Sequence, residues 1–283
     1  MNKSRFGELE VLARTPQGPA RAVPLLFIHG AYTAAWCWEE HFLPFFAEAG
    51  YAAYAVSLSG HGGSRGRDRL DSFSIADYVA DVAAVAASLS PNSTGTPPPN
   101  STGAPPAPPV LIGHSMGGFV VQKYLEDHEA SGAALICSVP PQGLMASAFG
   151  LMFSRPGLMK DLNRLMGGGQ VSLETLREAL FSQPVAVDDL KRFYHLAQAE
   201  SFRAIWDMTL FNLPHPSRVG KSPLLVLGAE FDHMVPASLV EMTARTYNVE
   251  AEIFPGMGHG LMLERDWKKP ARRILEWLEA QGF

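Results

Sequence analysis

One short stretch of this chain has the residue types of an activated nucleophile: residues 113–117 read Gly-His-Ser-Met-Gly. An apolar run, 110–112, precedes the stretch, and an amphipathic run follows it. This order predicts a buried strand that turns sharply into a helix and displays Ser115 at the turn. Glycines on both sides of the serine let the strand and the helix approach closely. The pattern therefore indicates a nucleophilic serine.

A serine hydroxyl is a weak nucleophile near neutral pH, so it needs a base and an acid that orients that base. His259 is the expected base, because it lies in a glycine-rich loop after the apolar segment 249–254. Asp232 is the expected acid, at the end of another apolar run. Glu230, in the same loop, is the alternative acid. Activity should then rise from acidic to neutral pH as the imidazole loses its proton.

The order of serine, aspartate and histidine, each after a strand-like run, resembles that of the α/β-hydrolase family. Residues 29–32 (His-Gly-Ala-Tyr), 60–64 (Gly-His-Gly-Gly-Ser) and 235–236 (Val-Pro) are similar to further motifs of that family. The resemblance implies an oxyanion hole made by the backbone N–H groups of Ala31 and Met116. Met116 is expected at a helix N-terminus, where free N–H groups and the helix dipole favour negative charge.

The chain departs from the family pattern near the expected site. Many members carry an aspartate before the turn with the second histidine, whereas residues 57–60 read Ser-Leu-Ser-Gly. The stretch 30–38 looks like that of plant methylesterases, hydroxynitrile lyases and bacterial esterases. In the lyases a lysine follows the catalytic histidine, so Gly260 argues against lyase chemistry. A serine at 115, rather than an aspartate, argues against dehalogenase and epoxide hydrolase activity.

Alternating apolar runs predict an α/β fold: a mainly parallel sheet flanked by helices on both faces, with a helical cap insertion. The core is expected at 1–142 and 219–283, and the cap at 143–218. The expected strands are 8–13, 24–28, 52–57, 110–113, 133–138, 223–228 and 249–254. The expected helices are 36–49, 74–89, 117–128, 237–247 and 267–280.

A proline-rich stretch, 91–109, contains an eight-residue tandem repeat within this core. Residues 91–98 recur at 99–106 with a single change. Proline removes backbone donors and favours extended conformers, which predicts a solvated, weakly ordered connection. A neutral repeat expansion explains it more simply than a docking role for a partner domain.

The expected cap carries Leu-Met pairs at seven-residue spacing, from Leu144 to Met166. Such a stripe stays on one helical face, and it serves either to pack the cap onto the core or to line an apolar pocket. Methionine is flexible enough to suit varied lipophilic substrates. The candidate substrate-binding residues are Tyr32, Trp36, Phe149, Met152, Phe153 and Trp206.

Length and composition agree with a soluble enzyme of one core plus an insertion. The chain has 283 residues, 47% of them hydrophobic, and a net charge of −5 without long charged runs. This charge gives no reason to expect nucleic acid or an anionic membrane as a partner. The first residues lack an apolar leader pattern and no window has the length of a membrane span, which makes a cytoplasmic location the expectation. Cys37 and Cys137 are expected as buried thiols rather than a disulfide.

Together these observations predict a serine hydrolase that cleaves carboxylic esters of small to medium lipophilic substrates through an acyl-enzyme intermediate. No cofactor or metal is expected, because the protein supplies the nucleophile, the base and the electrostatic stabiliser. Three alternatives keep the same triad: a C–C bond hydrolase, a lactonase and a thioesterase. A ligand receptor with a weakly active triad is an alternative of another class.

Overall fold

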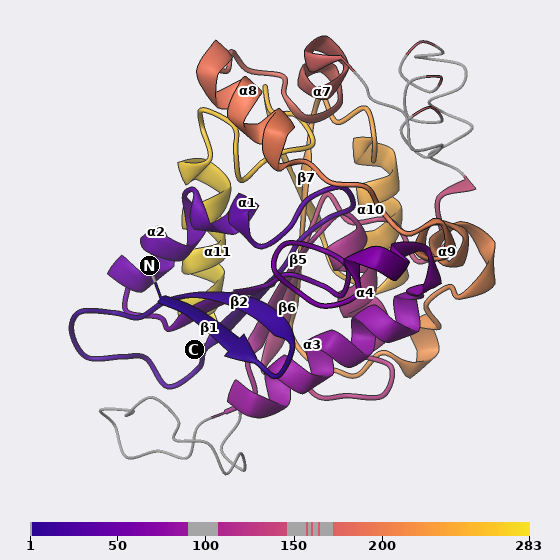
Figure 1. Cartoon of the computed structure of the whole chain (residues 1–283). Coiled ribbons are helices and arrows are strands. Elements are labelled where there is room, and N and C mark those ends of the chain that lie inside the picture. Colours follow the sequence, from indigo (N-terminus) through magenta and orange to yellow (C-terminus); the bar gives the residue numbers. More distant parts are fainter. Residues whose placement is uncertain (1, 90–106, 146–156, 158–159, 161–163, 165–171) are drawn as a thin grey trace.

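An eight-stranded sheet forms the centre of the protein (Figure 1). The computed structural model describes residues 2–89, 107–145, 157, 160, 164 and 172–283. The strands follow the spatial order β1-β2-β4-β3-β5-β6-β7-β8, in which β1, β2 and β4 pair antiparallel and all later neighbours pair parallel. Their bounds are Asn2–Phe6, Leu9–Arg14, Leu25–Ile28, Ala53–Val56, Val110–His114, Gly132–Ile136, Leu224–Ala229 and Ala251–Phe254, from β1 to β8.

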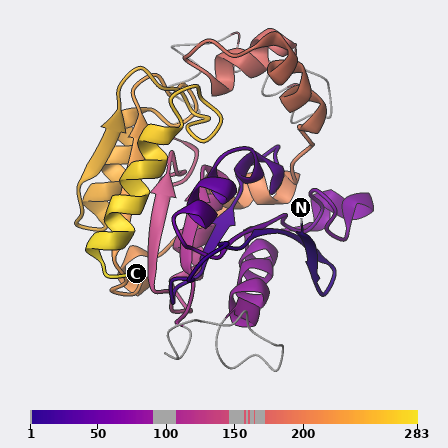
Figure 2. The same cartoon turned by 90° about the vertical axis from the view of Figure 1, so that its left-hand side faces the viewer.

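Helices cover both faces of the sheet (Figure 2), and each face has its own apolar core. One core contains side chains of α1 (Trp36–Glu39), α2 (Phe42–Glu48) and α11 (Lys268–Ala280). The other contains side chains of α3 (Ile75–Leu89), α4 (Met116–Tyr124) and α10 (Ala237–Thr246). Strand β3 supplies both, because successive side chains alternate: Phe27 joins the first core and Ile28 the second.

The predicted fold class, an α/β fold with a mainly parallel sheet, is confirmed. Strand β1 was not expected, since Asn2 to Arg5 are polar and lack the apolar alternation of a half-buried strand. The single helix expected at 36–49 is wrong: α1 ends at Glu39 and α2 begins at Phe42. Pro44 explains the break, because a proline is tolerated in the first turn of a helix but not in its interior.

The chain between β6 and β7 forms further helices beside the loops that follow the strands. They are α7 (Leu173–Leu180), α8 (Val187–Leu196), α9 (Phe202–Trp206), the π-helical turn η2 (Asp207–Phe211) and the short η3 (Pro216–Arg218). Figure 2 shows α7 and α8 arched above the sheet. The limits of the cap, 143–218, remain a prediction. Most of the Leu-Met stripe and both copies of the tandem repeat lie outside the described residues.

Within the described ranges, no helix is both long and apolar enough to cross a membrane.

Candidate active site

Ser115 lies at a strained turn between β5 and α4. Its φ of 52° and ψ of −117° fall in a region that residues other than glycine rarely adopt. The turn is held by its neighbours: the Ser115 N–H donates to the Ile136 carbonyl at 2.9 Å, and the Ser115 carbonyl accepts from the Val139 N–H at 3.2 Å. The strained residue is therefore Ser115, which the sequence predicts to be the nucleophile.

Two glycines of the motif sit where no side chain fits. A Cβ at Gly117 would lie 2.3 Å from the Ile28 carbonyl oxygen, and one at Gly113 would lie 2.5 Å from the Gly117 oxygen. In each case the nearest atom belongs to the backbone, which cannot rotate away as a side chain does. Glycine is thus required for α4 to pack directly against the ends of β3 and β5.

His259 and Asp232 form a buried pair. His259 Nδ1 lies 2.7 Å from Asp232 Oδ2, and the other oxygen of Asp232 accepts from the Met234 and Val235 N–H groups at 2.8 Å each. Since the carboxylate accepts, Nδ1 carries a proton and Nε2 is the nitrogen available as a base. The alternative acid, Glu230, accepts instead from the Gly256 N–H at 2.8 Å.

His114, the residue before the nucleophile, joins the two halves of the site. Its Nε2 donates to the His259 carbonyl oxygen at 2.9 Å, and the two rings lie 4.6 Å apart between centroids. Burial, and then the nearby His259, hold the pKa of His114 well below its usual value, so His114 is a neutral donor. Nothing in the sequence indicated this contact, since the two residues lie 145 positions apart.

Cys137 contacts the acid of the buried pair. Burial raises the pKa of this thiol, and the neighbouring Asp232 carboxylate, to which the thiol donates, raises it further. Its Sγ, a carboxylate oxygen of Asp232 and a ring nitrogen of His259 lie within 4.8 Å of one another. A soft cation would find S, O and N ligands here only by displacing the hydrogen bond between His259 and Asp232. Both cysteines are buried and unpaired, as expected.

The expected oxyanion donors belong to two segments that meet at Ser115. Met116 is the first residue of α4, so its N–H is among those without an acceptor inside the helix. Ala31 follows Gly30, where an added Cβ would lie 3.1 Å from the Ser115 Cβ. The loop that carries Ala31 therefore packs directly on the nucleophile. That these two N–H groups bind an oxyanion remains a prediction.

Glu10 compensates for the missing aspartate at residues 57–60. The Ser57 hydroxyl donates to Glu10 Oε2 at 2.8 Å and accepts from the Ala35 N–H at 3.1 Å. The same carboxylate oxygen accepts from the Gly63 N–H at 2.9 Å. A carboxylate is thus still present at this turn, but it comes from strand β2, which the order of residues in the sequence did not indicate.

Glu264 ties the loop of His259 to the helices between β6 and β7. Its buried carboxylate accepts from the N–H groups of Gly258 at 2.8 Å, Ser182 at 2.7 Å and Gln183 at 3.1 Å. The Gly260 N–H also donates to the Leu180 carbonyl at 2.7 Å. The loop that carries His259 is therefore fixed by contacts with both the core and the expected cap.

The predicted substrate-binding residues are only partly described. Tyr32 has a φ of 64°, and its carbonyl accepts from the Gln198 N–H at 2.8 Å. Trp36 stacks on Phe193 of α8, with ring centroids 5.6 Å apart. Trp206, on α9, is 54% exposed. Phe149, Met152 and Phe153 lie outside the described residues, and the lipophilic pocket remains a prediction for the whole set.

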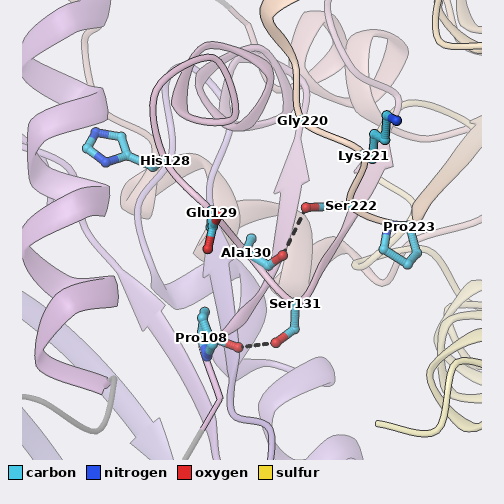
Figure 3. Close-up of a pocket in the computed structure, with 9 residues that line it drawn as sticks. All are labelled: Pro108, His128, Glu129, Ala130, Ser131, Gly220, Lys221, Ser222 and Pro223. Atoms are coloured by element: carbon cyan, nitrogen blue, oxygen red, sulfur yellow. Dashed lines mark hydrogen bonds between the residues drawn. The ribbon is translucent and has the colours of Figure 1, made fainter.

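A separate hollow lies at the amino ends of the parallel strands (Figure 3). Its lining includes Pro108, Ser131 and Pro223, which lie within two residues before β5, β6 and β7. The predicted catalytic residues instead follow the carboxyl ends of their strands. Ligands of parallel α/β sheets bind at the carboxyl ends, so the hollow of Figure 3 is not the expected active site.

Comparisons with known proteins match most of the chain. The pattern of the Alpha/beta hydrolase family matches residues 25–272. A monoacylglycerol lipase of Mycolicibacterium smegmatis is 24% identical over 276 residues, which cover 93% of this chain and 90% of the lipase. A non-heme haloperoxidase of Rhodococcus erythropolis is 26% identical over 274 residues, with 84% and 86% covered.

Solved structures share the fold at lower identity. An esterase from Exiguobacterium antarcticum superposes with a TM-score of 0.68 at 18% identity, over 96% of this chain and 95% of the esterase. A monoacylglycerol lipase from Paleococcus ferrophilus gives 0.68 at 21% identity, over 97% and 100%. These similarities concern the arrangement of the backbone.

Proposed function

Because this chain belongs to the alpha/beta hydrolase family, we propose that it is a serine hydrolase that cleaves carboxylic esters of small to medium lipophilic substrates. The observation that carries the proposal is the strained turn at Ser115, together with a buried His259–Asp232 pair that is joined at 2.7 Å and linked to the turn through His114. A strained serine and an oriented imidazole are what nucleophilic catalysis on an ester requires. The esterase and lipase relatives support the substrate class.

In the proposed reaction, the Ser115 oxygen attacks the ester carbonyl while His259 Nε2 takes the hydroxyl proton. Asp232 keeps the other ring proton in place and stabilises the imidazolium. The N–H groups of Ala31 and Met116 bind the negative oxygen of the tetrahedral intermediate, and each such donor is worth about 10²–10³ in kcat. The C–O bond to the alcohol then breaks, and His259 returns the proton to the leaving oxygen.

Water completes the cycle. His259 takes a proton from a water molecule, the hydroxide attacks the acyl carbon, and the bond to the Ser115 oxygen breaks to release the acid. The proton returns from His259 to the serine.

Labelling with a fluorophosphonate tests the nucleophile directly. We expect mass spectrometry to find the adduct on Ser115 in the wild type and to find none in His259→Ala at the same time point. His128→Ala is the matched control, because His128 is an exposed histidine beside the hollow of Figure 3. An adduct on another residue, or equal labelling of His259→Ala, would refute the assignment.

A substrate panel tests the bond that is cleaved. We expect p-nitrophenyl esters of increasing acyl length to be hydrolysed faster than thioesters, lactones or vinylogous diketones. Activity confined to the diketones would replace the ester hydrolase with a C–C bond hydrolase. Slow single-turnover hydrolysis with tightly retained product would instead favour the ligand receptor.

The haloperoxidase relative favours one further reaction of the same acyl-enzyme. Hydrogen peroxide in place of water would attack the acyl carbon and release a peroxyacid, which oxidises bromide. Bromination of a dye that depends on acetate, peroxide and Ser115 tests this reaction. Unchanged bromination by Ser115→Ala would refute it.

A further inference from the structure

The segment 197–201, which joins α8 to α9, crosses between two loops of the core. The Gln198 N–H donates to the Tyr32 carbonyl at 2.8 Å, and its side-chain oxygen accepts from the Gly62 N–H at 3.0 Å. The Ser201 hydroxyl donates to the Phe73 carbonyl at 2.6 Å. The segment thus contacts both the loop that carries Ala31 and the loop that follows β4.

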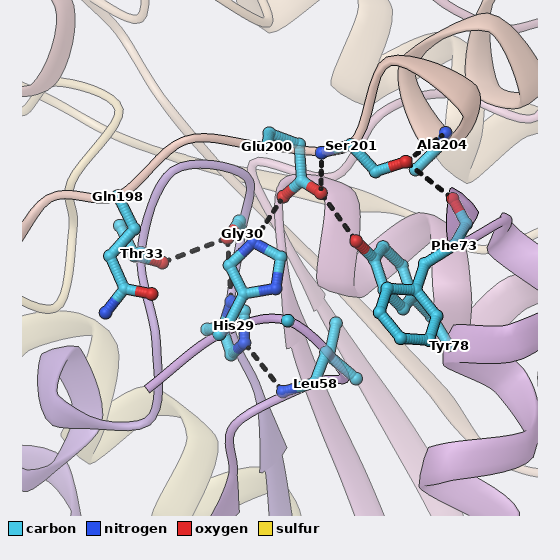
Figure 4. Close-up of polar contacts among 12 residues, drawn as sticks. His29, Gly30, Thr33, Leu58, Phe73, Tyr78, Gln198, Glu200, Ser201 and Ala204 are labelled. Carbon is cyan, nitrogen blue, oxygen red and sulfur yellow. Dashed lines mark hydrogen bonds and ion pairs between the residues drawn. The ribbon is translucent and has the colours of Figure 1, made fainter. Parts of the chain in front are cut away.

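Glu200 extends from this segment into the interior (Figure 4). Its side chain has no exposed surface, and one oxygen accepts from the Tyr78 hydroxyl and from the Ser201 N–H, at 2.7 Å each. The other oxygen lies 3.1 Å from His61 Nε2, which is equally buried. A buried carboxylate is costly unless a charged partner accompanies it, so the pair needs a structural or functional reason.

His61 lies between two oxygen atoms, one near each ring nitrogen. Its Nδ1 lies 3.2 Å from the Ser59 carbonyl oxygen, and its Nε2 lies near the Glu200 carboxylate. The carboxylate is at ion-pair distance but outside hydrogen-bond geometry, so it favours the imidazolium through its negative charge. Burial lowers the pKa of His61, but Glu200 and the Ser59 carbonyl raise it by more, so it ends above its usual value. His61 is therefore the charged partner of Glu200.

The neighbouring His29 is neutral and holds the next peptide. The rings of His61 and His29 lie 5.1 Å apart between centroids. His29 Nε2 accepts from the Leu58 N–H at 3.0 Å, so its Nδ1 carries the proton and donates to the Gly30 carbonyl at 2.8 Å. Burial, and then the charge on His61, lower the pKa of His29 to about 3.

The Gly30 carbonyl decides the direction of the Ala31 N–H. The two groups belong to one trans peptide and point to opposite sides of it. The carbonyl oxygen is bound by His29 Nδ1 on one side and by the Thr33 hydroxyl, at 3.0 Å, on the other. With the oxygen fixed in this way, the N–H is fixed as well.

We propose that Glu200 and His61 are positioning residues for the oxyanion hole, through which the cap fixes the loop that carries Ala31. The inference rests on the proposed function, since it assigns Ala31 the role of oxyanion donor. Glu200 secures His61, His61 packs against His29, and His29 binds the Gly30–Ala31 peptide. The segment 197–201 adds a direct contact to the same loop at Tyr32.

Glu200→Gln tests the proposal while keeping the shape of the side chain. We expect kcat for p-nitrophenyl acetate to fall about tenfold with KM changed less than about twofold, because the oxyanion forms only after binding. The Kd of phenylboronic acid, which forms a tetrahedral adduct on the serine, should rise by about the same factor. Glu40→Gln is the matched control: it removes another ion pair between cap and core, that of Arg192 and Glu40, which lies at the surface.

His61→Asn tests the pair from the other side, because the amide of this variant can still donate to the Ser59 carbonyl. We expect the same losses as for Glu200→Gln, and no further loss in the double variant, since both changes break one connection. Thermal unfolding identifies the temperature at which each variant is folded, and both assays are run there.

Three results would overturn the proposal. The first is a folded Glu200→Gln or His61→Asn variant with wild-type kcat and wild-type boronate affinity. The second is a pair of losses that simply add in the double variant. Either result leaves the proposed function intact. The third, a wild-type protein that is not labelled at Ser115, would overturn the proposed function together with this inference.

Discussion

Gly117→Ala separates two opposing effects of a methyl group in the nucleophile turn. Gly117 is the second residue of α4, and alanine in a helix is favoured over glycine by about 1 kcal/mol. The added Cβ, however, would lie 2.3 Å from the Ile28 carbonyl oxygen and 2.5 Å from that of His29. Both are backbone atoms, so α4 and the end of β3 must move apart by roughly 1 Å.

This displacement should reduce both stability and activity. Overpacking of this kind costs about 1–3 kcal/mol and the helix propensity of alanine returns about 1 kcal/mol, so we expect a net loss of about 1 kcal/mol in the free energy of unfolding. Ala31 follows Ile28 on one of these segments, and Ser115 directly precedes Met116 on the other. The same movement therefore separates Ala31, one of the two expected oxyanion donors, from Ser115. A misplacement of about 1 Å in a catalytic site can cost about 10²-fold, which is the loss in kcat that we expect.

Urea unfolding and hydrolysis of p-nitrophenyl acetate measure the two effects. Gly18→Ala is the matched control, because a Cβ there meets no atom within 4 Å and the φ of Gly18 is not positive. We expect the control to stay within about 0.5 kcal/mol of the wild type, with unchanged kcat. A Gly117→Ala variant that is more stable than the wild type, with full activity, would show that helix propensity dominates and that the packing argument is wrong.

Asp232→Asn should lower kcat by about 10⁴, whereas Glu230→Gln should leave kcat nearly unchanged. Equal losses in the two variants would contradict the choice of Asp232 as the acid that orients His259. Cys137→Ala should lower kcat severalfold and the free energy of unfolding by about 1 kcal/mol, and Cys137→Ser, which keeps a donor to the carboxylate, should retain more of both. For the pair of Glu200 and His61, Glu200→Gln should cost most stability between about pH 4.5 and 6.5. The lowered pKa of Glu200 contributes stability that is lost as pH falls, and the raised pKa of His61 contributes stability that is lost as pH rises. A urea midpoint difference independent of pH would refute this.

Patterns local to a few residues predicted the fold well. Apolar runs located every strand from β2 to β8, because the strands of a sheet covered on both faces are rich in apolar residues, even though charged residues interrupt β2 and β8. The pairing of His259 with Asp232, rather than with Glu230, followed from the turn after the acid. Strand β1 was missed, since an edge strand of polar residues has no apolar signal.

The sequence did not predict the long-range contacts that charged groups make in the site. Glu200, Glu264 and Glu10 each bind partners more than 45 positions away, and each looks like an ordinary surface carboxylate in the sequence. Such contacts depend on how loops of different strands meet at one edge of the sheet. The signal that would have helped is the apolar setting of Glu264, which follows Leu261, Met262 and Leu263.

The place of the proline-rich stretch has a practical consequence. The described residues on its two sides include Leu89, at the end of α3, and Pro108, which lines the hollow at the amino ends of the strands. Loop closure becomes costlier only slowly with length, and this junction faces away from the catalytic edge. An epitope tag, a fluorescent protein or additional copies of the octapeptide inserted here should leave turnover unchanged, which makes the junction the natural point for attaching the enzyme to a surface.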